Sequence, residues 1–120
     1  MAVKAFETET HVGGVSSVKP TFKRIDAVAV NTTQANCDIL DIRGIGTALA
    51  VKPPGSVTSL TFYGAEKSDG TFVLIDDAGT NGVVTVTASR WKLVPAAVLA
   101  HGFIQMQSAG ANGNCVVVGK

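Results

Sequence analysis

Charged residues are scarce in this 120-residue chain, at 16% of the total against about 25% in typical globular domains. Ten lysines and arginines nearly balance nine acidic residues, which leaves a net charge of +1. Such a chain lacks the electrostatic footprint of a protein that binds nucleic acid or an anionic membrane. It also lacks an apolar run of the ~20 residues that span a bilayer, and its start lacks the apolar core of a signal peptide. We therefore expect a soluble, unexported protein whose length suits one domain.

Good helix formers other than alanine are scarce too, with three glutamates and six leucines. Valine, threonine and isoleucine together number 35 of the 120 residues. Their branched side chains suit a pleated sheet better than a helix. The hydrophobic fraction of 46% excludes intrinsic disorder. The composition therefore predicts an all-β protein.

Short apolar runs alternate with turn signals from residue 25 onward. This pattern predicts an antiparallel β-sandwich of eight or nine strands, either jelly-roll or immunoglobulin-like, with a small barrel as the less favoured alternative. Pro95 predicts one helical turn over 95–99, and Asp69-Gly70 predicts a hairpin turn. The expected strands cover residues 25–31, 37–43, 47–52, 57–63, 72–75, 83–88, 90–93, 103–108 and 115–118.

Alternation within the best-patterned strands predicts which side chains are buried. In the run 37–43, Asp38 shares one face with Leu40 and Ile42. In the run 103–108, Gln105 and Gln107 are expected to point outward. The expected core contains the inward positions of the strongest strands, namely Leu60, Phe62, Phe72, Leu74, Ile104, Met106 and Val117.

Residues 1–24 differ from the sandwich domain expected over 25–120. They carry isolated apolar residues, the Gly13-Gly14 pair and a charge of +2, against −1 for the rest of the chain. A segment of this kind buries little surface by itself, so it is either a frayed terminus or an extended N-terminal arm that becomes ordered against a partner subunit. Both interpretations remain open from the sequence.

The candidate metal ligands are two histidines, His11 and His101, and two cysteines, Cys37 and Cys115. None of the four lies at the short spacing by which a turn directs two ligands at one zinc ion. A disulfide between the cysteines is conceivable, but an unexported chain favours free thiols. We therefore expect two buried free cysteines and no metal site.

Catalytic patterns are equally scarce. The sequence has no G-x-S-x-G nucleophile motif and no glycine-rich loop that ends in G-K-[ST]. The paired carboxylates Asp76-Asp77, with Asp69 nearby, lie in turn-rich stretches where aspartate satisfies loop backbone groups. The sequence thus predicts no catalytic, metal or cofactor-binding residue, and no enzyme.

Exposed aromatic residues are the remaining candidates for a binding site. Among seven aromatics, only Trp91 is flanked by cations, at Arg90 and Lys92. The simplest interpretation places Trp91 in the core or at its rim. The alternative is a sugar-binding face on which Trp91 and Tyr63 act as stacking platforms.

Five short motifs follow one another between Leu40 and Lys120, a stretch of about two thirds of the chain. They are Leu60-Thr61-Phe62-Tyr63-Gly64, Asp69-Gly70-Thr71-Phe72, Leu93-Val94-Pro95, Gly102-Phe103-Ile104-Gln105 and the final run 116–120. In this order they resemble small β-sandwich structural proteins of tailed bacteriophage virions. Ala65 and Glu66 follow Gly64 where those proteins usually have a serine.

The resemblance implies a non-enzymatic virion protein, most often a capsid decoration protein on the outer capsid surface. The partners that it implies are the major capsid protein and further copies of this chain, assembled in the host cytoplasm. It implies no catalytic residue and no cofactor. The alternative function is a carbohydrate- or receptor-binding module of a phage tail or fibre.

Overall fold

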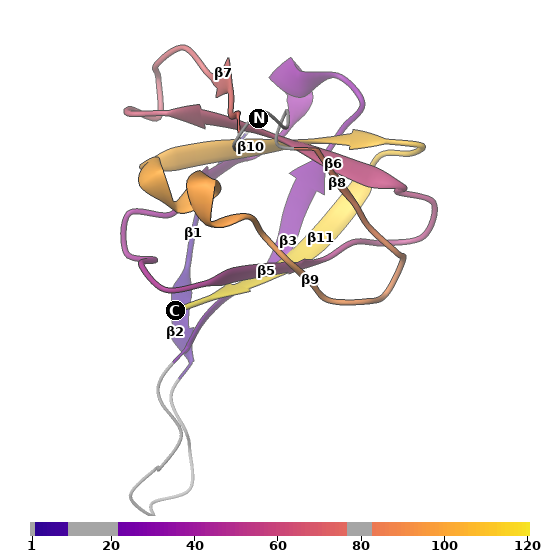
Figure 1. Ribbon diagram of the computed structural model, residues 1–120, viewed down its shortest axis with the longest axis horizontal. Helices are drawn as coiled ribbons and strands as arrows, with labels where there is room; N and C mark the ends of the chain where they lie inside the picture. The colour runs from indigo at the N-terminus through magenta and orange to yellow at the C-terminus, as the bar shows by residue number, and fades with distance from the viewer. Residues whose placement is uncertain (1, 10–21, 77–82) are drawn as a thin grey trace, which may run out of the picture.

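The computed structural model describes residues 2–9, 22–76 and 83–120, and its strands form two β-sheets (Figure 1). Among these residues helix is limited to two short 3₁₀ turns, η1 (Gln34–Asn36) and η2 (Ala96–Ala100), and neither is long or apolar enough to cross a membrane. The predicted all-β class is confirmed. Pro95 precedes η2, as expected for the one predicted helical turn.

Sheet A has six strands in the order β1-β4-β10-β6-β7, with β8 also paired to β6. Its strands are β1 (Val3–Ala5), β4 (Ile39–Asp41), β10 (Phe103–Ala109), β6 (Ser59–Ala65), β7 (Val73–Leu74) and β8 (Val83–Thr85). Sheet B has five strands in the order β2-β3-β11-β5-β9. These are β2 (Glu7–Glu9), β3 (Phe22–Val30), β11 (Gly113–Gly119), β5 (Leu49–Lys52) and β9 (Lys92–Leu93).

The strands β1 and β2 lie in the segment expected to be an arm. Strand β1 pairs in parallel with β4, whereas β2 pairs antiparallel with β3, so the chain passes from sheet A to sheet B at Phe6. Strand β3 also begins at Phe22, before the expected boundary at residue 25. The described parts of the segment are therefore strands of the two sheets, and residues 10–21 of it lie outside the described range. The parallel β1–β4 pair corrects the expectation of a wholly antiparallel sandwich.

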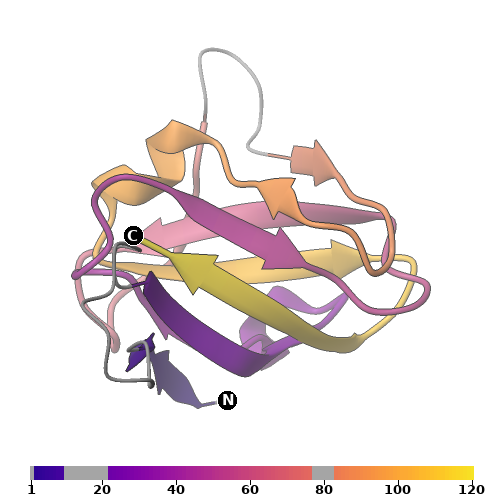
Figure 2. The same ribbon diagram turned by 90° about the horizontal axis from the view of Figure 1, so that it is seen from below.

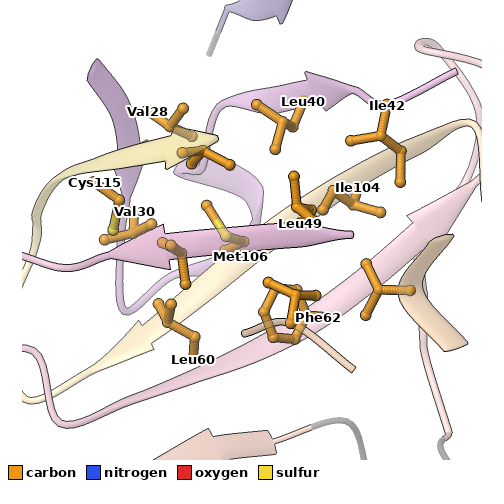
Figure 3. Close-up of a cluster of buried hydrophobic side chains, with 14 of the residues drawn as sticks. Val28, Val30, Leu40, Ile42, Leu49, Leu60, Phe62, Ile104, Met106 and Cys115 are labelled. Atoms are coloured by element: carbon orange, nitrogen blue, oxygen red, sulfur yellow. The ribbon is translucent and has the colours of Figure 1, made fainter. Parts of the chain in front are cut away.

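The core lies between the two sheets and is lined by side chains from both (Figure 3). Sheet A contributes Leu60 and Phe62, and sheet B contributes Val28 and Val51, all at most 1% exposed. Of the seven expected core residues, Leu60, Phe62, Ile104, Met106 and Val117 are buried.

The other two expected core residues, Phe72 and Leu74, were assigned wrongly. Leu74 is 40% exposed and Phe72 is half-buried, while Ile75 takes the buried place. Leu74 lies opposite Tyr63 in the β6–β7 pair, and residues directly opposite each other share a face. Because Phe62 points inward, Tyr63 and Leu74 point outward. Ile75 is held at the core by its N–H, which donates to the Phe62 carbonyl at 3.0 Å.

We predict that Phe62→Ala lowers the free energy of unfolding by about 3–5 kcal/mol, because it leaves a cavity among close-packed side chains. The matched change Leu74→Ala, on the outer face, is expected to cost about 1 kcal/mol or less. Urea denaturation followed by far-ultraviolet circular dichroism measures both. Equal losses in the two variants would contradict the orientation of β6.

Candidate functional site

The two cysteines are free and buried, as the sequence predicted. Cys37 lies just before β4, where its thiol is 3.5 Å from the Asn31 carbonyl and 3.7 Å from the Thr33 carbonyl. Burial raises the pKa of Cys37, and it raises the pKa of Cys115 to about 12, with a smaller contribution from Cys37. Both thiols therefore stay protonated at neutral pH, when a nucleophile or metal ligand would need the thiolate.

The other candidate metal ligands do not lie close together in the structure either. His101 is half-buried against Gly64, whose hydrogen atom faces the imidazole so closely that a Cβ there would lie 2.6 Å from the ring. Asp69 and Asp76 are exposed, while His11 and Asp77 lie outside the described residues. Within the described ranges, no group of three His, Cys, Asp or Glu side chains is placed to hold a metal ion.

One carboxylate is buried, and the search for site residues in the sequence missed it. Asp38 is 8% exposed, and its two oxygens accept the backbone N–H groups of Ala2, at 3.1 Å, and Ala29, at 2.9 Å. The sequence did contain a signal for this burial, because Asp38 shares one strand face with the apolar residues Leu40 and Ile42. Both oxygens are used to join strands, so Asp38 is a structural group.

An open hollow of about 420 Å³ lies between the N-terminal strands and the β4–β5 connection. Two cations, Lys23 and Arg43, line it beside Phe6. The Arg43 guanidinium forms two hydrogen bonds with Asp41, at 2.8 and 3.0 Å, and this pairing lowers the pKa of the Asp41 carboxyl. Lys23 donates to the Gly44 carbonyl at 3.2 Å. Because each cation already has a partner in the chain, the hollow is a weak candidate for an anion site.

Part of the outer face of sheet A is covered, and side-chain amides bond to the covering segment. Gln105 is buried there and donates to the Cys37 carbonyl at 2.9 Å, while Gln34 of η1 donates to Gln105. Gln107 donates to the Thr32 carbonyl at 2.8 Å and accepts from the Tyr63 hydroxyl at 2.9 Å. The two glutamines point outward as expected, but the segment that contains η1 lies over them (Figure 1).

The outer face of sheet B is open and largely apolar. Ala50 of β5 lies between Leu93 of β9 and Val118 of β11, and Val116 lies opposite Lys52. Leu93 is 65% exposed. Trp91, which directly precedes β9, is 51% exposed and has the Lys52 ammonium 5.2 Å from its ring centroid.

This arrangement separates the two aromatics proposed as joint sugar platforms. Trp91 lies with Lys52 on the outer side of sheet B, whereas Tyr63 bonds to Gln107 on the outer side of sheet A. The structure does not bring them together, and it places Trp91 at the surface instead of in the core. Any stacking site on this protein would use Trp91 without Tyr63.

Comparison with known proteins gives no assignment: no family model matches the chain, and neither a curated protein nor a solved structure matches it significantly.

We predict two titratable thiols per chain when the protein is denatured without reductant. In the native protein both should react slowly with a thiol reagent at pH 8, because both are buried and their pKa values are raised. Reaction with Ellman's reagent in native buffer and in urea measures the difference. A denatured protein without free thiols would instead demonstrate a disulfide.

Proposed function

We propose that this protein is a non-enzymatic structural component of a bacteriophage virion. Specifically, it is a capsid decoration protein that binds and reinforces the outer capsid lattice. The motifs between Leu40 and Lys120 support this assignment through their resemblance to virion β-sandwich proteins. We further propose that the two sheets form a jelly-roll or immunoglobulin-like sandwich and that the N-terminal segment 1–24, besides supplying strands to both sheets, helps to contact neighbouring subunits.

The observation that carries the proposal is the distribution of apolar surface. Six large hydrophobic side chains are exposed among the described residues: Val3, Val73, Leu74, Val83, Trp91 and Leu93. Exposed apolar side chains that lie together mark contact with other proteins, and Val73 with Leu74 and Trp91 with Leu93 are neighbouring pairs of this kind. A protein that packs against a lattice and against copies of itself needs such faces more than a cleft. The major capsid protein and further copies of this chain are therefore the proposed partners.

The exposed indole of Trp91 favours a second candidate, a carbohydrate- or receptor-binding module of a tail or fibre. Aromatic rings at protein surfaces can stack on sugar rings, and Trp91 is half exposed. Strong binding on a glycan array that is abolished in Trp91→Ala would favour this candidate over decoration.

We predict that purified virions contain hundreds of copies of this protein, because a lattice-binding protein repeats with the symmetry of the shell. Quantitative mass spectrometry against the major capsid protein measures the ratio. About a dozen copies or fewer would indicate a tail component, and absence from virions would contradict both candidates.

A further inference from the structure

The outer side of sheet B combines an apolar strip with a cationic margin. We call it the β5–β9 face and define it by Ala50, Lys52, Trp91, Leu93, Val116 and Val118, with Arg90 and Lys92 at its margin. Figure 2 views this side: β5 and β11 lie in front of the paler strands of sheet A, and no described segment crosses them. The strip is therefore accessible to a partner.

The cations of this face have no carboxylate partner among the described side chains. The ion pairs within the described ranges are Arg24–Asp26 and Arg43–Asp41. Lys52 is directed toward the Trp91 ring instead, while Arg90 and Lys92 are exposed on either side of that ring in the sequence. Lys92 lies opposite Val51, on the other side of β9 from Leu93. Lys52 therefore contacts the half-exposed indole, while Arg90 and Lys92 place two further positive charges at the same edge of the sheet.

The two outer faces differ in how far their polar groups are already satisfied. On sheet A, Gln107 and Gln105 are bonded to the segment that covers them, through the carbonyls of Thr32 and Cys37. On the β5–β9 face, Leu93 is 65% exposed, and neither Lys52, Arg90 nor Lys92 forms an ion pair with a described side chain. Strands of sheet A also carry exposed apolar side chains, at Val3, Val73, Leu74 and Val83. The β5–β9 face combines its exposed apolar area with a cationic margin, and this combination makes it the candidate docking surface.

The charge of the face also indicates the partner's chemistry. A second copy packed on it through a two-fold axis that passes near Trp91 would bring Lys52, Arg90 and Lys92 near their equivalents, and like charges opposed across an interface are unfavourable. A partner surface with carboxylates around an apolar centre would form ion pairs with the cations and bury the apolar strip.

We propose that the β5–β9 face is the capsid-binding surface of this protein and that it docks on an acidic, apolar-centred patch of the major capsid protein. This inference rests on the proposed function. Trp91 and Leu93 supply the contact area, while Lys52, Arg90 and Lys92 select an acidic surface.

The first test locates the interface on particles. Capsids assembled without this protein are loaded with purified wild-type protein, and free and bound forms are compared by hydroxyl-radical footprinting with mass spectrometry. Trp91 and Leu93 should be protected on the capsid. Leu74, on the outer face of sheet A, should react equally in both forms and serves as the internal control.

The second test uses a pair of charge reversals matched in exposure. Arg90→Glu, on the margin of the face, should weaken capsid binding about tenfold at low salt, and added salt should weaken wild-type binding. Lys67→Glu carries the same charge change at another exposed turn and should bind like wild type. Co-sedimentation with capsids gives both affinities.

The outcomes separate the inference from the proposed function. If wild-type protein does not sediment with capsids, decoration itself is contradicted. If it sediments while Leu74 is protected and Trp91 is not, or while Arg90→Glu and Lys67→Glu bind alike, decoration stands and the inference is wrong. Concentration-dependent protection of Trp91 without capsids would identify a second copy as the occupant and would also overturn it.

Discussion

The Asp38 carboxylate lies where strands of both sheets meet, and its two oxygens accept backbone amide protons from Ala2 and Ala29. Ala29 belongs to β3 in sheet B, while Ala2 and Asp38 immediately precede β1 and β4 in sheet A. The backbone repeats the connection, since Asp38 N–H donates to the Ala29 carbonyl and Ile39 N–H donates to the Ala2 carbonyl. A buried charge without such donors costs several kcal/mol. The need to satisfy this carboxylate therefore ties the N-terminal strand, β3 and β4 into one arrangement.

Because hydrophobic side chains fill the space between the two sheets, of the sheet faces only the outer ones are open to another molecule. Sheet A turns amides outward, and the covering segment with η1 satisfies them. On the outer side of sheet B, strands β5, β9 and β11 present small and aliphatic side chains together with Lys52, and no described segment crosses these strands. The two outer faces thus differ in their polar groups: the amides on sheet A are bonded within the chain, whereas Lys52 on sheet B lies against the exposed Trp91 ring.

The inward face of a strand could be predicted from the sequence where the strand was long and its polar and apolar residues alternated. Strands β6 and β10 meet this condition, and the inward sides of both were predicted correctly. The run Phe72–Ile75 is four apolar residues, so no alternation reveals its faces, and the pairing of Leu74 with Tyr63 decides them. Strands β1 and β2 were missed because single apolar residues stand between polar ones there, which reads as an arm, and β1 is held through backbone bonds and Asp38. The β5–β9 face depends on which strands become neighbours, which no local pattern encodes.

Trp91 is the only tryptophan of the chain, and it lies on the surface beside Lys52. Its intrinsic fluorescence therefore reports on water and charge at the outer side of sheet B, and hardly at all on the packing around Phe62. An indole that is already half in water changes its surroundings little when the chain unfolds. The protein thus has a built-in optical probe of its open face, while its core is silent in tryptophan emission.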